Sequence, residues 1–340
     1  MFSGRISPQE AGSQTMNPTK CRLGLASLGL AFSFALGCSS TEPVPEAPPV
    51  AAATPVDRGH YIVNAVAMCF YCHSEHDWSG EEPKILAGRQ GAGALFPDES
   101  IPGRLYAPNI TPDEETGIGR ATDEQLDKAI REGIGLDGRR LFPVMPNFSM
   151  MSDEDLAGVI AYLRSQPAVS NKVPEREFPE PVLAGLPPAW PITRPVGGPA
   201  GEGPSVQRGQ YLSSLADCAS CHTAMNEMGQ PRMELAFGGG FELKGPWGEV
   251  VSPNITFDAS GIEYYDEALF KKVLSTGDPG ARRLNKIMPV HIYRNMTDRD
   301  MASVFLFLQS LPHVKHRVDN TEDPAPCPIC GQSHGLGASN

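Results

Sequence analysis

Two short stretches decide how the rest of the sequence is interpreted: CFYCH at residues 69–73 and CASCH at residues 218–222. Each stretch places two cysteines three positions apart and a histidine directly after the second cysteine. The chain has 8 Cys and 8 His among 340 residues, so chance would rarely produce this pattern even once. The spacing of the cysteines, rather than their number, therefore indicates their chemistry.

Cysteines at i and i+3 lie about one helical turn apart, so both thiols can reach the two vinyl groups on one edge of a porphyrin. The histidine at i+4 then directs its imidazole toward the iron. Local disulfides or a zinc site are the alternatives, but neither explains a histidine after both pairs. We therefore expect two covalently bound c-type haems. The attachment cysteines and axial histidines are Cys69, Cys72 and His73 for one haem, and Cys218, Cys221 and His222 for the other.

The second axial position of each iron needs a ligand from elsewhere in the chain. Methionine sulfur takes this position in c-type haems that carry electrons, and it raises the reduction potential. Met145 and Met288 are the candidates, because each lies in a loop before the last helix of its unit and precedes a proline. The proline disfavours helix at the methionine and keeps its backbone extended.

Other side chains are weaker candidates for this axial position. His76 lies too close to His73, and His291 has no counterpart in the first unit, so both are expected to be surface histidines. The competing methionines abut a helix cap or follow the axial histidine too closely; they are Met150, Met151, Met225 and Met296.

The two cysteine motifs belong to a longer internal repeat. RGHY at residues 58–61 recurs as RGQY at 208–211, and PNIT at 108–111 recurs at 253–256. Counted from the first cysteine onward, the equivalent positions lie 143 to 149 residues apart and in the same order. One unit has therefore been duplicated. We expect the repeated Asn109 and Asn254 to hold a turn through side-chain to backbone hydrogen bonds.

Apolar spacing predicts helices in each unit and an all-α fold, with each unit a small helical bundle around one haem. Residues 57–67 place their apolar side chains on one helical face and are expected to run straight into the first cysteine motif. Thr122 with Gln125 forms a capping-box pattern. Ser152 and Thr297 are expected to cap the last helix of each unit, which Pro167 and Pro312 then stop.

The chain begins with an export signal. Lys20 and Arg22 precede an apolar run at residues 23–36, which is too short to span a bilayer. Residues 1–37 are predicted to be a signal peptide whose true start is Met16. The ending before Cys38 resembles a bacterial lipobox, so residues 38–56 are predicted to be a lipidated, proline-rich tether that holds an exported, periplasmic protein on a membrane.

The remaining segments divide the chain further. Haem-binding units are expected at residues 57–166 and 206–314, separated by a proline-rich extended linker at 167–205 in which prolines forbid a stable helix. The tail at 315–340 contains Cys327 and Cys330, which we expect to form a local disulfide in an oxidising compartment. A metal-binding or reactive dithiol role is the alternative.

Composition excludes some functions. The chain has 35 Gly and 33 Pro, so much of it is expected to be loop, yet its hydrophobic content of 40% is ordinary for a globular protein. The net charge of −12 argues against a nucleic-acid partner.

The two Cys-x-x-Cys-His units, each with its Pro-Asn-Ile-Thr and Met-Pro elements, resemble the cytochrome c subunits of bacterial membrane-associated alcohol and gluconate dehydrogenases. The resemblance covers residues 57 to about 314. It implies two tandem cytochrome c-like domains that pass electrons from a dehydrogenase to a respiratory-chain acceptor. Those subunits usually carry three haems, whereas this sequence has no third Cys-x-x-Cys-His motif. A two-haem carrier of the same domain type is therefore expected.

Three function classes are compatible with two haems. An electron-transfer protein, which is not itself an enzyme, keeps both irons six-coordinate. A di-haem peroxidase needs an open iron position with acid and base groups beside it, and a haem-based sensor needs one methionine to dissociate. Two candidate methionine ligands favour the electron carrier.

Overall fold

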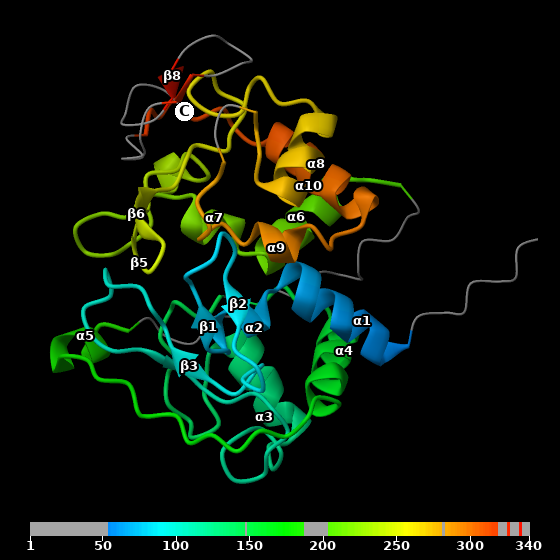
Figure 1. The fold of residues 1–340 in the computed structure, drawn as a ribbon, viewed down its shortest axis with the longest axis vertical. Coiled ribbons are helices and arrows are strands. Elements are labelled where there is room, and N and C mark those ends of the chain that lie inside the picture. Colours follow the sequence, from blue (N-terminus) through cyan, green and yellow to red (C-terminus); the bar gives the residue numbers. More distant parts are fainter. Residues whose placement is uncertain are drawn as a thin grey trace, which may run out of the picture. The chain divides into compact units, whose positions relative to one another are not determined.

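Short helices joined by long loops make up the protein (Figure 1). The structure is a computed structural model that describes residues 54–146, 148–186, 203–280, 283–318, 325–326 and 333–334. Residues 51–340 form one compact unit. The predicted signal peptide, Cys38 and nearly all of the tether lie outside the described residues, as do Cys327 and Cys330.

Equivalent elements follow one another in the two halves of this unit. The first half and the segment after it contain α1 (Pro55–Tyr61), η1 (Ile62–Val66), α2 (Cys69–Cys72), β1 (His76–Asp77), β2 (Lys84–Ile85), β3 (Ala94–Leu95), β4 (Tyr106–Ala107), α3 (Asp123–Asp127), η2 (Lys128–Glu132), α4 (Asp153–Arg164) and α5 (Glu180–Ala184). The second half and the tail contain α6 (Val206–Leu215), α7 (Cys218–Cys221), η3 (Met233–Leu235), β5 (Glu242–Gly245), β6 (Gly248–Val251), α8 (Glu267–Thr276), α9 (Val290–Tyr293), α10 (Asp298–Ser310), β7 (Ala325–Pro326) and β8 (Ser333–His334).

A close helix crossing organises each half. Helix α1 packs along α4, and α6 packs along α10 (Figure 1). A Cβ at Gly59 would lie 1.9 Å from the carbonyl oxygen of Gly158, and one at Gly209 would lie 1.8 Å from that of Ser303. The repeated Arg-Gly pair therefore places glycine where the two helix backbones touch.

The predicted helix caps are confirmed. The side chains of Thr122, Ser152 and Thr297 each accept a hydrogen bond from the backbone N–H three residues later, and Gln125 completes the capping box. The apolar faces predicted for the last helix of each half are buried. These faces contribute Leu156, Val159, Ile160 and Leu163 on α4, and Met301, Val304, Phe305 and Leu308 on α10.

The helix predicted at residues 57–67 is present, but the expectation that it runs straight into the first cysteine motif is wrong. The helix changes to π-helical geometry at Ile62–Val66, and Met68 then adopts a left-handed conformation with φ of 45°. Asp217 does the same before the second motif, with φ of 56°. A left-handed residue breaks the helix, so each cysteine motif forms a separate four-residue helix.

The prediction of a mainly helical fold is confirmed, because helices supply buried side chains of the hydrophobic core. The described strands form small two-stranded antiparallel pairs, of which β5 with β6 is the longest. The expectation that the proline-rich segment excludes helix is wrong at α5. Pro181 lies at the second position of that helix, where a backbone N–H would have no helical partner.

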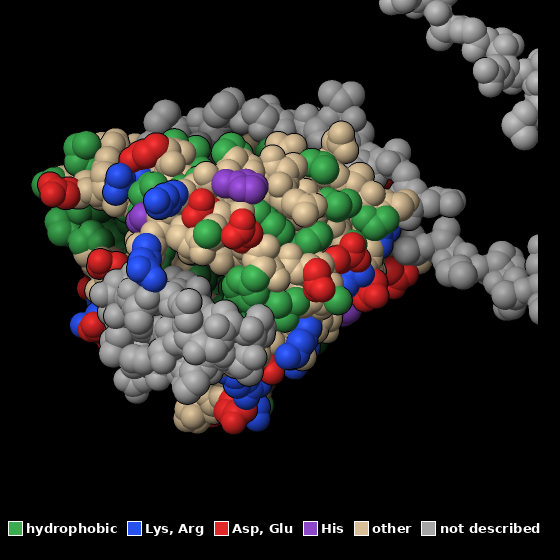
Figure 2. Space-filling view, turned by 90° about the horizontal axis from the view of Figure 1, so that it is seen from above, with side chains coloured by type: hydrophobic (Ala, Val, Ile, Leu, Met, Phe, Trp, Pro, Cys, Tyr) green, Lys and Arg blue, Asp and Glu red, His purple; other side chains and the backbone are tan. Residues whose placement is uncertain are grey.

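The surface of the described residues mixes charged and apolar side chains. On the face in Figure 2, acidic and basic side chains are interspersed rather than gathered by sign. None of the described helices has the length and apolar character needed to cross a bilayer.

One tyrosine from each half contacts an aspartate of the other half. The hydroxyl of Tyr61 on α1 donates to Asp300 on α10 at 2.5 Å, and the hydroxyl of Tyr211 on α6 donates to Asp155 on α4 at 2.5 Å. Each aspartate also pairs with the arginine of its own half, Arg208 for Asp300 and Arg58 for Asp155.

The charge of Asp300 is stabilised at this contact. Burial opposes its ionisation, but the hydrogen bonds from Arg208 and Tyr61 outweigh burial and lower the pKa of the carboxyl. Burial, followed by the bond to Asp300, raises the pKa of Tyr61 to about 12, so the phenol remains a donor. The carboxylate therefore stabilises the fold above its ordinary pKa, and this contribution is lost as the pH falls through the lowered value.

Replacing Gly59 by Ala should reduce the free energy of unfolding by about 1–3 kcal/mol, because the new methyl group must push α1 and α4 apart. Chemical denaturation measures this change. Gly203→Ala is the matched control, since no atom lies within 4 Å of its added Cβ. Equal stability of the two variants would contradict the close crossing.

Replacing Tyr211 by Phe should cost about 1.5–3 kcal/mol, the range for a hydrogen bond to a charged group. The control is Tyr106→Phe, whose hydroxyl accepts an exposed bond from Arg104 and whose loss should stay within about 0.5 kcal/mol. Denaturant unfolding of both variants tests whether the contact between the halves stabilises the protein.

Candidate functional site

Each cysteine motif gathers two thiols and one imidazole on a single turn of chain. The backbone N–H groups of His73 and His222 donate to the carbonyls of Cys69 and Cys218, which closes the turn. All four cysteines in these motifs are unpaired, so they do not form the alternative disulfides. Among the described residues, no group of three or more His, Cys, Asp and Glu side chains gathers as a metal site.

Burial keeps these thiols protonated in the chain. It raises the pKa of Cys69, Cys72 and Cys218 to about 12, and it also raises the pKa of Cys221.

The histidines of the two cysteine motifs have the same environment. His73 and His222 are buried, and their Nδ1 atoms lie 2.7 Å from the carbonyl oxygen of Pro108 and 2.8 Å from that of Pro253. A carbonyl oxygen only accepts, so Nδ1 must carry the proton. Burial lowers the pKa of both imidazoles, which keeps them neutral. The lone pair of each Nε2, for which the described residues provide no hydrogen-bond donor, is then available to an iron.

The carbonyls that orient the histidines belong to the repeated PNIT segment, and the prediction that its asparagines hold a turn is confirmed. Asn109 accepts from the backbone N–H of Thr111 at 2.9 Å and donates from Nδ2 to the carbonyl of Val169 at 2.7 Å. Asn254 repeats both contacts with Thr256 and Val314, at 2.9 and 2.7 Å. Each buried asparagine therefore fixes the turn and the segment after the last helix together.

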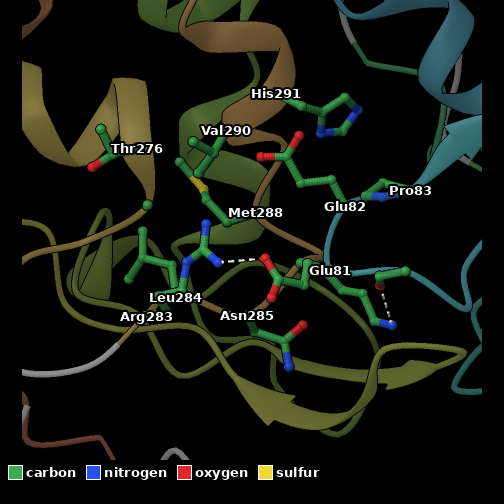
Figure 3. Close-up of a pocket in the computed structure, with 13 residues that line it drawn as sticks. Glu81, Glu82, Pro83, Thr276, Arg283, Leu284, Asn285, Met288, Val290 and His291 are labelled. Atoms are coloured by element: carbon green, nitrogen blue, oxygen red, sulfur yellow. Dashed lines mark hydrogen bonds and ion pairs between the residues drawn. The ribbon is translucent and has the colours of Figure 1, made fainter.

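The structure places Met145 and Met288 in equivalent turns. Their backbone N–H groups donate to the carbonyls of Phe142 and Asn285, each at 3.0 Å. Both side chains are half-buried and pack against the hydrophobic core. Met288 also lines a cleft of about 300 Å³ beneath the loop that contains Glu81 (Figure 3). Their role as axial ligands remains a prediction.

His76 and His291 are not open surface residues, contrary to the sequence-based expectation. Both are half-buried, with ring centroids 5.6 Å from that of Tyr71. Tyr71 lies inside the first cysteine motif, where the second motif has Ser220. In the sequence, this difference between the two motifs distinguishes Tyr71, but by itself it does not indicate a function.

A buried indole N–H lies near the turn before Met288 in the chain's hydrogen-bond network. The indole Nε1 of Trp247 is buried and has no hydrogen-bond partner among the described residues. The side chain of Asn285 donates to the backbone carbonyl of Trp247 at 3.1 Å, so the backbone of this residue is tied to the turn before Met288. An acidic acceptor such as a haem carboxylate fits an orphaned N–H of this kind.

Comparisons with known proteins show which proteins this chain is similar to. Residues 54–163 match the family model described as cytochrome C oxidase, cbb3-type, subunit III. The chain is 30% identical over 246 residues to a diheme cytochrome c-type of Cereibacter sphaeroides, which covers 67% of this chain and 78% of that protein. The chain therefore belongs to the c-type cytochrome family.

Two further relatives are subunits of dehydrogenases. The chain is 31% identical over 290 residues to the fructose dehydrogenase cytochrome subunit of Gluconobacter japonicus, with 80% of this chain and 55% of the relative covered. It is 29% identical over 335 residues to the alcohol dehydrogenase (quinone) cytochrome c subunit of Gluconacetobacter polyoxogenes, with 89% and 65% covered. The chain thus spans between about half and two thirds of these relatives.

These matches confirm the resemblance to dehydrogenase cytochrome subunits. They also confirm the prediction of an electron-transfer protein or subunit rather than an enzyme, and family membership supports haem c as the cofactor.

Replacing Asn254 by Asp should lower the free energy of unfolding by about 1–3 kcal/mol, because the buried carbonyl of Val314 loses its donor and faces a carboxylate oxygen. Asn226→Asp is the control, since its amide nitrogen contacts Gln230 in an exposed loop. Denaturation monitored by haem absorption checks the difference. Equal stability would show that Asn254 does not hold the turn.

Proposed function

We propose that this chain is a di-haem c-type cytochrome that transfers electrons between a dehydrogenase and a respiratory-chain acceptor. One haem is bound through Cys69 and Cys72, and the other through Cys218 and Cys221. His73 and Met145 are the axial ligands of the first iron, and His222 and Met288 are those of the second.

One observation supports this proposal most strongly. Two buried imidazoles, 149 residues apart, each donate from Nδ1 to the carbonyl of a repeated proline and leave Nε2 without a hydrogen bond from the described residues. A single arrangement of this kind could be a satisfied core histidine. Its exact repetition beside two Cys-x-x-Cys pairs favours a binding function at both places.

The chain's own residues would tune and protect each haem. Bound haem iron supplies one-electron exchange between its ferric and ferrous states. The carbonyls of Pro108 and Pro253 fix the tautomer and the orientation of the imidazoles and increase their basicity as ligands. Thioether ligation from Met145 and Met288 raises the potential relative to bis-histidine ligation and leaves no open position on the iron.

The partners follow from the relatives. Several are cytochrome subunits of dehydrogenases, which supports a dehydrogenase as the electron donor. We further propose that the protein is exported to the periplasm and held on a membrane through lipidated Cys38. Residues 57–166 and 206–314 are proposed as the two haem domains, joined by residues 167–205.

Met145→Ala and Met288→Ala should each lower the reduction potential of one haem only. The expected change is on the order of 100 mV or more, within the roughly 0.8 V range that axial ligands set. Spectroscopic potentiometric titration of the purified full-length protein measures both potentials. The adjacent methionines provide a control, because Met150→Leu should leave both potentials unchanged.

An unchanged pair of potentials in either alanine variant would overturn that ligand assignment. A high-spin ferric haem in the wild-type protein would instead favour the peroxidase or the sensor, because both functions need an accessible iron position.

A further inference from the structure

The turn that carries Met288 is held by residues of the other half of the molecule. We propose that Tyr71 and Lys286 are positioning residues that make methionine ligation at the second haem depend on the first haem-binding half. This inference rests on the proposed function, since it takes Met288 as an axial ligand.

The first contact comes from the cysteine motif of the first half. The hydroxyl of Tyr71 donates to the carbonyl oxygen of Ile287 at 3.0 Å, one residue before Met288. The ring of Tyr71 is held by neighbouring rings on several sides, with centroid distances of 5.6 Å to His76, 5.9 Å to Trp78 and 5.6 Å to His291. These ring contacts restrict the orientation of Tyr71, whose hydroxyl donates to the Met288 turn.

The second contact comes from the loop after this motif. The ammonium group of Lys286 donates to the carbonyl oxygens of Trp78 at 2.5 Å and Gly80 at 3.1 Å. Two backbone acceptors from the first half thus hold the residue two positions before Met288. Lys286 also lines the cleft that Met288 lines.

Two ion pairs connect residues before and after Met288 in the sequence to the first half. Arg283 pairs with Glu81 at 2.7 Å (Figure 3), and Arg294 pairs with Glu82. These side chains are substantially exposed, so each pair contributes little energy by itself. The pairs matter for the position of the turn, because the two arginines flank Met288 in sequence and both carboxylates come from one loop of the first half.

The turn of Met145 is held differently. Arg176 donates to the carbonyl of Arg140 at 2.6 Å, and Phe178 stacks on Phe142 with centroids 4.5 Å apart. Both anchoring residues follow the first half directly in the chain. The described contacts therefore make the second ligand turn dependent on the first half, whereas the first ligand turn is fixed by the segment that follows it.

A looser turn must weaken the bond from the Met288 sulfur to iron, because the sulfur then loses part of its fixed orientation. Exogenous imidazole competes with methionine for this position, so its apparent affinity reports how firmly the methionine is held. Losing one hydrogen bond of ordinary strength corresponds to an increase of about 3- to 10-fold in that affinity.

The test uses Tyr71→Phe in the full-length, haem-loaded protein. Imidazole is titrated at fixed pH while the methionine-to-iron charge-transfer band is followed. The part of the band that is lost in Met288→Ala reports the second haem. We expect imidazole to displace this part at about 3- to 10-fold lower concentration in Tyr71→Phe than in the wild-type protein. The other part of the band should keep its wild-type affinity.

Tyr61→Phe is the matched control, because it also removes tyrosine hydrogen bonds between the halves, one donated to Asp300 and one accepted from the backbone N–H of Thr297, but none to the carbonyl before Met288. It should leave both imidazole affinities unchanged. If Tyr71→Phe fails to fold, Lys286→Gln replaces it in the same titration and should again affect one haem only.

The outcomes separate this inference from the function on which it rests. A wild-type protein without a methionine-to-iron band from its second haem would overturn both. A wild-type protein with both bands, combined with unchanged affinities in Tyr71→Phe, would overturn the positioning role alone. Equal changes at both haems, or the same change in Tyr61→Phe, would also overturn it, since they indicate general loosening of the contact between the halves.

Discussion

The hydrogen bond from a buried imidazole Nδ1 to a backbone carbonyl is the constraint on which the rest of the structure depends. His73 and Pro108 make this bond in one half, and His222 and Pro253 make it in the other. It fixes which nitrogen carries the proton and which nitrogen can bind a metal. The cysteine helix on one side and the asparagine turn on the other both serve to keep that geometry, which is why these elements recur together in the duplicated sequence.

Duplication produced two similar halves but not two equivalent environments. The tyrosine contacts are reciprocal: Tyr61 reaches the aspartate of the second half, and Tyr211 reaches that of the first. The surroundings of the ligand turns are not reciprocal, because Tyr71 and the loop after it contact the turn of Met288. The common core can therefore preserve the fold while the surroundings of the two methionine turns differ.

Local sequence patterns predicted much of this structure, and long-range contacts explain the rest. Capping by Ser152 and Thr297 is encoded within four residues, so it could be recognised directly. The left-handed break at Met68 could not, since no glycine marks it and the adjacent apolar spacing is helical. The contact of Tyr61 with Asp300 joins positions 239 residues apart. Tyr61 was recognised as part of a repeated stretch, but a repeat does not state which residue of the other half it contacts.

The central claim is that each of two irons is held between an imidazole and a thioether. Low-temperature electron paramagnetic resonance of the purified ferric protein, with haem content determined on the same sample, tests it most directly. The account predicts two haems per chain, both low-spin and both accompanied by a methionine-to-iron band. One haem per chain, or a high-spin signal from a haem with water or hydroxide at an axial position, would contradict it.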